Sequence, residues 1–203
     1  PRPQMIANLK VGDLLVLDLF SESRQNFEDF CTGENTSGPG KKDFSTSKKE
    51  GIYGKHQWLF CLLENFGGNV GLHGRMDQLL NNFYLATGKK DTPKQENSSL
   101  LTLHSSLKGW GFTMEGSENN PVMFELMSEL PWRAEKITKE DWIREYCYAR
   151  YGVHDATIEK AWILLAQSIY NCPKGNIQQG THESIFCARP SLNSYQVSTW
   201  SLM

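Results

Sequence analysis

Three short apolar runs alternate with stretches of helical periodicity in the first two thirds of the chain. The runs cover residues 14–20, 58–63 and 109–114, and each has the length of a β-strand. Continuous apolar runs are typical of strands covered on both faces, as in parallel sheets. Apolar residues recur at helical spacing over residues 71–88 and 120–130. Strands that alternate with helices predict βαβ units and an α/β fold with a parallel sheet.

Capping residues mark the ends of the predicted helices. Gly88 is suited to end the first helix, and Asn120, which precedes a proline, is expected to cap the second. Thr138 opens a segment that resembles a capping box, and the helix that follows is expected to end at Gly152. Asp155 is the expected cap of a further helix.

The pattern divides the chain into two parts of different character. Residues 1–130 have the βα pattern, with predicted loops over 31–54 and 91–106, and residues 131–203 begin an all-α domain. Three strands cannot close a barrel, and a (β/α)8 barrel with its helices takes about 250 residues. Since the chain also begins at Pro1 without an initiator methionine, we expect the last part of a βα domain that continues into a helical one.

Composition and charge exclude several classes of protein. The 203 residues include 10 Phe, 7 Tyr and 6 Trp, too much apolar surface for a disordered chain. With 21 Lys and Arg against 23 Asp and Glu, no basic excess exists for a sequence-independent nucleic-acid binder. No apolar run reaches the ~18 residues that a membrane span needs. The 5 cysteines include no Cys-x-x-Cys pair, which disfavours a structural zinc site.

Two glutamates stand where predicted strands end. Glu115 follows the third apolar run and Glu64 follows the second. Catalytic groups of barrel enzymes project from the carboxyl ends of strands, so either could act as a nucleophile or general base. Retaining glycosidases hold two such carboxyls ~5–5.5 Å apart, and inverting glycosidases hold them ~6.5–9.5 Å apart. The alternative is that both are polar residues at turns. Asp18 and Glu22 are weaker candidates, since Asp18 is expected between strand and helix and Glu22 in solvent.

Amide and aromatic side chains gather near the same predicted strand ends. They are Asn65, Phe66, Asn69, Trp58 and Trp110. Amides bond sugar hydroxyls and aromatic faces cover the C–H faces of a pyranose, so together with a carboxylate the set favours a carbohydrate. For any single Trp or Phe, a role in the core is the commoner one.

Other chemistries fit the sequence poorly. Gly109 and Gly111 begin a Gly-x-Gly, but Met114 stands where the dinucleotide fingerprint needs its third glycine. His182 is followed by Glu but lacks the second His of the helical zinc protease motif. Cys61 lies inside an apolar run, so we expect a buried thiol rather than a nucleophile.

A series of blocks in order along the chain carries a family resemblance. The blocks are residues 14–22, 58–72, 111–116, 119–122, 132–133, 149–152 and 168–172. Asn-Phe-Gly-Gly-Asn followed by Met-Glu-Gly at this separation is quite specific. The sequence resembles glycoside hydrolase family 89, the alpha-N-acetylglucosaminidases.

The resemblance implies a (β/α)8 barrel followed by a large all-α domain. It also implies retaining hydrolysis of terminal α-linked N-acetylglucosamine, with no metal or cofactor. The family nucleophile falls on Glu115, and substrate-binding positions fall on Leu63, Asn65 and Phe66. Glu64 matches no catalytic residue of the family, so it is not the expected acid/base. The resemblance places the family's acid/base glutamate on an earlier strand, outside this chain.

The resemblance further implies a glycan partner and a secreted, periplasmic or lysosomal location, and the charge balance predicts no nucleic-acid partner. Two alternatives remain. One is a carbohydrate-binding or inactive fragment in which Glu115 is structural. The other is a helical interaction module formed by the helices after Thr138, although their apolar faces are expected to cover the barrel.

Overall fold

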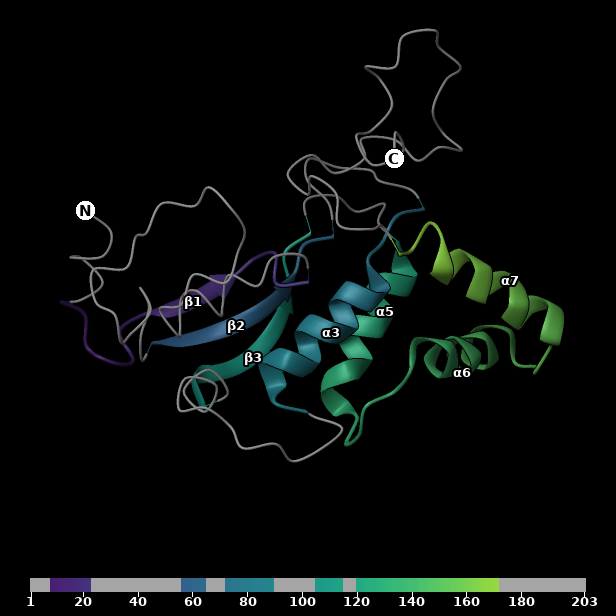
Figure 1. Ribbon diagram of the computed structural model, residues 1–203. Coiled ribbons are helices and arrows are strands. Elements are labelled where there is room, and N and C mark those ends of the chain that lie inside the picture. Colours follow the sequence, from purple (N-terminus) through teal and green to yellow (C-terminus); the bar gives the residue numbers. More distant parts are fainter. Residues whose placement is uncertain (1–7, 23–55, 65–71, 90–104, 115–119, 172–203) are drawn as a thin grey trace, which may run out of the picture. The chain divides into compact units, whose positions relative to one another are not determined.

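The computed structural model describes residues 8–22, 56–64, 72–89, 105–114 and 120–171 (Figure 1). The chain divides into two compact units. The first unit is Pro1–Leu62 with Asn82–Phe112, and the second unit is Leu63–Asn81 with Thr113–Met203. The predicted loops lie outside the described residues, apart from the end of the second one at Ser105 and Ser106.

The first unit contains a parallel sheet of β1 (Leu15–Asp18), β2 (Gln57–Leu62) and β3 (Leu107–Phe112). The strands follow one another in the order β1-β2-β3 and run side by side in Figure 1. The register places Phe60 of β2 between Asp18 and Trp110 of its neighbours. The three predicted strands and their parallel arrangement are therefore confirmed.

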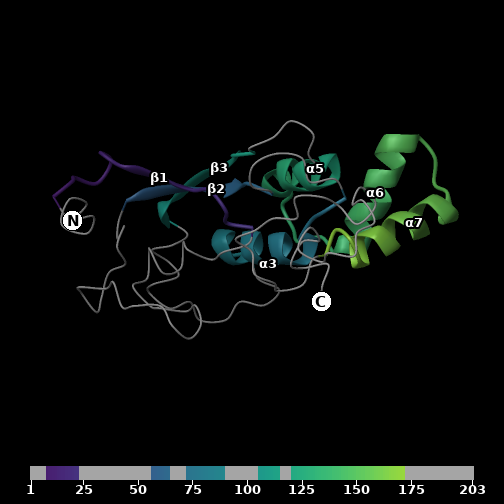
Figure 2. The same ribbon diagram turned by 90° about the horizontal axis from the view of Figure 1, so that it is seen from above.

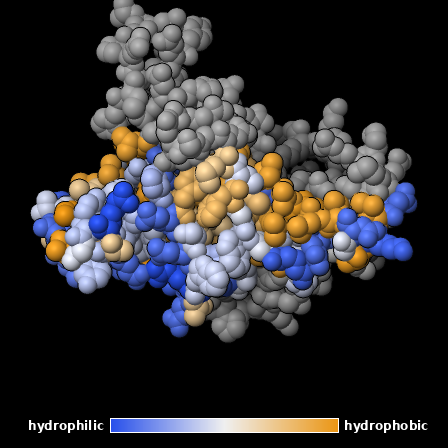
Figure 3. Space-filling model, turned by 180° about the vertical axis from the view of Figure 1, so that it is seen from behind, coloured by the Kyte–Doolittle hydropathy of each residue, from blue (hydrophilic) through white to orange (hydrophobic). Residues whose placement is uncertain are grey.

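The expectation that these strands are covered on both faces is wrong for β1 and β3. Leu15 and Leu17 of β1 are 48% and 50% exposed, and Trp110 of β3 is 41% exposed. Figure 3 shows orange, hydrophobic patches on one face of the described residues. The central strand β2 is buried because it has a strand on each side, and its Phe60 ring meets Phe83 edge-on at 5.7 Å.

Helix α3 (Met76–Thr87) connects β2 to the segment before β3, and it contributes residues to both units. It starts later than the apolar periodicity predicts, but it ends where expected. Gly88 has a φ of 69°. A left-handed residue lets the chain leave the helix, and glycine adopts that conformation without a steric penalty.

Among its described residues, the second unit has four further helical elements, three of which are labelled in the view of Figure 2. They are α5 (Pro121–Glu129), the 3-10 turn η1 (Leu130–Trp132), α6 (Lys139–Tyr151) and α7 (Ala156–Gln167). The α6 and α7 helices lie side by side, and the Tyr146 ring meets Trp162 edge-on at 4.9 Å. An aromatic contact of this kind adds to the area that the two helices bury.

The predicted caps of α6 and α7 are confirmed. The Thr138 hydroxyl accepts a hydrogen bond from the Asp141 N–H at 3.1 Å, and α6 ends at Gly152, whose φ is 74°. The Asp155 carboxylate accepts from the N–H groups of Thr157 and Ile158 at 2.8 and 3.0 Å. These bonds satisfy backbone donors that a helix start otherwise leaves unpaired.

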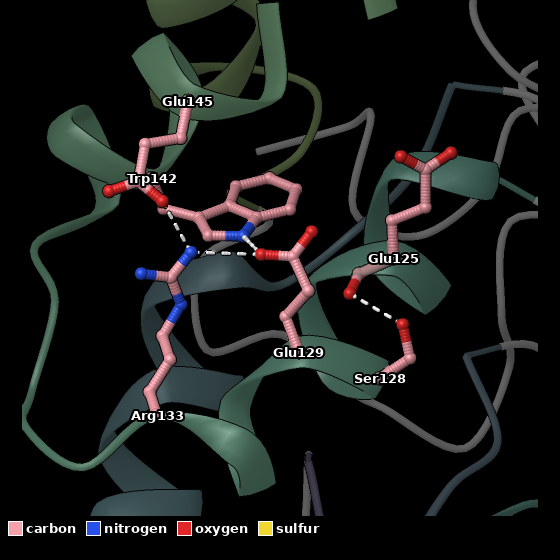
Figure 4. A network of polar contacts seen from close by, with 6 residues as sticks. All are labelled: Glu125, Ser128, Glu129, Arg133, Trp142 and Glu145. Atoms are coloured by element: carbon pink, nitrogen blue, oxygen red, sulfur yellow. Dashed lines mark hydrogen bonds and ion pairs between the residues drawn. The ribbon is translucent and has the colours of Figure 1, made fainter. Parts of the chain in front are cut away.

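A polar network joins the end of α5 to α6 (Figure 4). The Arg133 guanidinium contacts the carboxylates of Glu129 and Glu145, at 2.9 Å for Glu129. The Trp142 indole N–H donates to the same Glu129 carboxylate at 2.9 Å. Hydrogen bonds to Glu145 and Glu129 raise the pKa of Arg133, so this cation stays charged between its two partners.

Candidate active site

Ser21 fixes the turn that follows β1. Its N–H donates to the Cys61 carbonyl at 3.1 Å, and its hydroxyl accepts from the Cys61 N–H at 3.4 Å. The hydroxyl also donates to the Asp18 carbonyl at 2.8 Å, and the buried Asn82 amide donates to the Ser21 carbonyl at 2.8 Å. These bonds connect the carboxyl ends of β1 and β2 within the first unit.

Two acids are buried at this end of the sheet. Asp18 is 4% exposed and Glu22 is 1% exposed. The prediction that Glu22 is solvated is therefore wrong, because the turn fixed by Ser21 keeps this stretch of chain within the folded unit. Asp18, which the sequence analysis expected between a strand and a helix, is the last residue of β1.

Cys61 is a free, buried thiol, as the sequence predicts. Burial raises its pKa to about 11, and the negative charges of Asp18 and Glu22 add to that effect. The thiol therefore stays protonated near neutral pH. Only the thiolate is a strong nucleophile, so Cys61 is unsuited to covalent catalysis.

The chain that leaves β2 belongs to the second unit. Leu63 and Glu64 are 4% and 5% exposed, and Glu64 has a φ of 68°. A left-handed backbone is uncommon for a residue other than glycine, and such strained positions cluster at functional sites. Burial, followed by the charge of Glu64, raises the pKa of Tyr170 to about 12. The buried Glu64 carboxyl thus lies near a phenol that keeps its proton.

The segment 72–76 is held on two sides in the second unit. The His73 N–H donates to the Asn120 side-chain oxygen at 3.0 Å, and the Met76 N–H donates to the Tyr170 carbonyl at 2.9 Å. Burial and the neighbouring Arg75 charge lower the pKa of His73 to about 4, so its imidazole is neutral at physiological pH.

The expectation that Asn120 caps its own helix is only half right. Asn120 stands at the N-cap position of α5 and Pro121 follows it, but the Asn120 side chain makes no capping hydrogen bond. Its oxygen accepts from His73 instead. Proline at the first helical position removes one of the backbone donors that need a cap, which frees the asparagine for another partner.

The structure describes one of the four predicted site residues, Leu63, which is buried directly after β2. Glu115, Asn65 and Phe66 lie outside the described residues, as does Asn69. Of the aromatic candidates, Trp58 is a core residue with 2% exposure, whereas Trp110 is 41% exposed.

Sequence reasoning missed Ser21, His73 and Asn82 as residues that fix the surroundings of the site. Each is buried, and each makes its contact with a residue at least 40 positions away. No local pattern marks such a contact. A serine or asparagine inside an otherwise apolar stretch is the single hint, because a buried polar group needs a partner.

In the part of the chain that the structure describes, no group of three or more His, Cys, Asp or Glu side chains is arranged to hold a metal ion. None of the helices there has the length and hydropathy required to cross a membrane.

A parallel sheet whose strands alternate with helices, followed by helices alone, is the pattern of the last part of a βα barrel that continues into a helical domain. The chain belongs to the alpha-N-acetylglucosaminidase family. Residues 1–134 match the model of that family's tim-barrel domain, and residues 142–202 match the model of its C-terminal domain.

The proteins to which this chain is similar belong to the same family. Human alpha-N-acetylglucosaminidase is 31% identical over 190 residues, which cover 93% of this chain and 21% of the human protein. A family 89 glycoside hydrolase from Clostridium perfringens, solved with PUGNAc, matches 97% of this chain and 18% of its own, with a TM-score of 0.64 and 23% identity. The chain therefore spans about a fifth of the length of these relatives.

A second solved structure from Clostridium perfringens is a family 89 protein in which two glutamates are replaced by glutamine. It was solved in complex with its substrate GlcNAc-alpha-1,4-galactose. It is 26% identical to this chain, covers 92% of it with 17% of its own length, and has a TM-score of 0.56.

Proposed function

We propose that the complete protein is a retaining glycoside hydrolase that releases terminal α-linked N-acetylglucosamine. The observation that carries the proposal is membership of the alpha-N-acetylglucosaminidase family, with matches to the models of its tim-barrel domain and its C-terminal domain. The activity is assigned to the complete protein, because this chain spans only 21% of the human relative. We propose that it acts outside the cytoplasm, in a secreted, periplasmic or lysosomal location.

Glu115 is the proposed nucleophile. It follows the last residue of β3 by three positions, and Asn65 follows the last residue of β2 by three positions. Neighbouring strands lie about 4.8 Å apart, so side chains at equivalent places beyond two paired parallel strands can reach one sugar ring. Leu63, Asn65 and Phe66 are the proposed contacts to that ring.

The reaction would run in two steps. The Glu115 carboxylate attacks the anomeric carbon while a second glutamate, outside this chain, protonates the leaving oxygen. Water then attacks the glycosyl-enzyme, and the second glutamate takes the proton from it. The substrate complex of the bacterial relative, in which two glutamates are replaced, supports a mechanism that depends on two carboxyls.

A carbohydrate-binding function without hydrolysis is the second candidate. This function is favoured for the given chain by itself, because the chain contains no residue that matches the family's acid/base. Binding of N-acetylglucosamine by the isolated chain, with no release of product, would be its signature.

Replacement of Glu115 by glutamine in the complete protein tests the nucleophile. We expect turnover of an aryl α-N-acetylglucosaminide to fall about 10³-fold or more, since a nucleophilic carboxylate is lost. Glu125→Gln is the matched control, because Glu125 lies on α5 with its side chain 44% exposed. Activity of Glu115→Gln equal to that of the control would refute the assignment.

Azide separates a nucleophile from an acid/base. In Glu115→Gly, azide should restore turnover and give the β-glycosyl azide, because the small anion attacks from the face that the carboxylate occupied. An α-glycosyl azide would show that Glu115 acts as the acid/base instead.

A further inference from the structure

We propose that Asn120 is a positioning residue: its bond to His73 ties the segment 72–76, which follows the proposed substrate-binding residues in the sequence, to the start of α5, which follows Glu115 in the sequence. The inference rests on the proposed function. It assigns a role to a residue that touches neither the sugar nor the reacting atoms in that proposal. The link itself, from the Asn120 side chain to the backbone of His73, lies within the described part of the second unit.

The link is buried on both sides. Asn120 is 3% exposed and His73 is 4% exposed, and the bond from the His73 N–H to the Asn120 oxygen measures 3.0 Å. Water has no ready access to replace a lost partner at such a site. A buried backbone N–H left unpaired is costly, so the folded chain has a strong preference for keeping this bond.

The position of the link along the chain gives it its importance. His73 comes seven residues after Phe66, and Asn120 comes five residues after Glu115. The two partners are 47 residues apart in sequence. One hydrogen bond therefore joins the chain that leaves the proposed substrate-binding segment to the chain that leaves the proposed nucleophile.

Close packing restrains the His73 side of the link. A Cβ atom at Gly74 would lie 2.6 Å from the Met123 sulfur and 3.1 Å from the Tyr170 ring. The Met76 N–H also donates to the Tyr170 carbonyl at 2.9 Å. Met123 belongs to α5, and Asn120 is the N-cap residue of that helix. The approach of Gly74 to Met123 and the bond from His73 to Asn120 therefore both hold the segment 72–76 against the start of α5.

The link matters for catalysis because attack requires close alignment. A displacement of about 1 Å between a bound reactant and the attacking group can cost about 100-fold in rate. Without the Asn120 oxygen, the two segments lose one of the contacts that set their separation. Substrate contacts on one segment survive, so the rate of attack should suffer more than binding does.

The test compares three variants of the complete protein. Asn120→Ala removes the acceptor, whereas Asn120→Asp keeps an oxygen that can accept from His73. Asp155→Ala is the control, since it deletes two backbone hydrogen bonds at the exposed start of α7. Each variant is assayed well below its own melting temperature with an aryl α-N-acetylglucosaminide, and hydrogen exchange of the His73 amide is followed in parallel.

For Asn120→Ala we expect exchange at His73 to be at least about tenfold faster, kcat to fall about tenfold or more, and KM to change less. Asn120→Asp should recover most of both, and Asp155→Ala should keep the wild-type kcat. A structural role alone would lower the melting temperature without this kcat effect or its recovery.

Three results would overturn the proposal. The first is unchanged exchange at His73 in Asn120→Ala, and the second is faster exchange with wild-type kcat. The third is an equal loss of kcat in Asn120→Ala and Asn120→Asp. Failure of the proposed function looks different, because the unmodified protein, or Glu115→Gln, would then show that hydrolysis is absent or independent of Glu115.

Discussion

The strand end of the first unit and the α6–α7 region of the second unit are fixed by hydrogen bonds of opposite kinds. At the strand end, Ser21 bonds to Cys61 and Asn82 bonds to Ser21, over 40 and 61 residues, and all of these groups are buried. At α6 and α7, Thr138 and Asp155 bond to residues two or three positions away, at exposed sites. The first region depends on the assembled fold, and the second forms its helix ends locally.

The two regions differ in whether a water molecule can replace a lost hydrogen-bond partner. A polar group exposed by mutation on a helix surface finds a water molecule, whereas one left inside the sheet region does not. Single substitutions should therefore weaken the strand end much more than the helix surface, even where the lost bonds have the same geometry.

The largest expected effect is that of Ser21→Ala. The variant loses the bond to the Asp18 carbonyl and leaves the Cys61 N–H without its side-chain acceptor, so we expect a loss of about 2 kcal/mol. Ser128→Ala is a matched control, because the Ser128 hydroxyl also donates to a carbonyl three residues earlier at 2.8 Å, but at an exposed site (Figure 4). Urea unfolding of the complete protein measures both. Equal losses in the free energy of unfolding for Ser21→Ala and Ser128→Ala would contradict the difference between the two regions.

An intermediate effect is expected for Arg133→Met. The Arg133 side chain is 25% exposed and lies between the Glu129 and Glu145 carboxylates, which would then repel each other. We expect a loss of about 1 kcal/mol that shrinks at high salt. Arg144→Met removes an ion pair with Asp141 in which both side chains are about half exposed, and it should cost less. Thermal unfolding at two salt concentrations decides whether partial burial makes the difference.

The smallest effect is the acid response of Asp155. Hydrogen bonds from the N–H groups of Ile158 and Thr157 lower its pKa in the folded chain. The unfolded chain binds the proton more readily, so this contribution is complete above the ordinary pKa of an aspartate, near 3.9, and is lost as the pH falls through the lower folded value. Asp155→Asn, which can still cap, should remove that part of the pH dependence of thermal unfolding. An unaltered profile between pH 2 and 5 would contradict it.

The same division explains which parts of the fold the sequence can predict. The helix ends at Thr138, Gly152 and Asp155 were predictable because a cap acts within four residues of itself. The three strands were predictable because apolar runs of that length have few alternatives. The exposure of the outer strands was not predictable, because Leu15 and Leu17 belong to an apolar run typical of a strand covered on both faces. The chain that carries this run spans only 21% of its human relative.

The candidate site was predictable to a different degree for each residue. Glu115 stands out because a carboxylate at a strand end is suited to catalysis, and the family motif singles it out further. The left-handed backbone of Glu64 has no sequence signal, because glutamate disfavours that conformation. The bond between His73 and Asn120 was equally hidden, since Asn120 before a proline has the appearance of an ordinary helix cap.

Helix α3 has a practical consequence for anyone who wishes to divide this protein. Its first half, Met76–Asn81, is counted with the second unit and its second half with the first, although its backbone hydrogen bonds run without interruption. An expression boundary inside α3 would divide one continuous helix, and each piece would lose the other half of that helix. The smallest piece worth producing by itself must therefore keep residues 76–87 whole, together with the chain on either side.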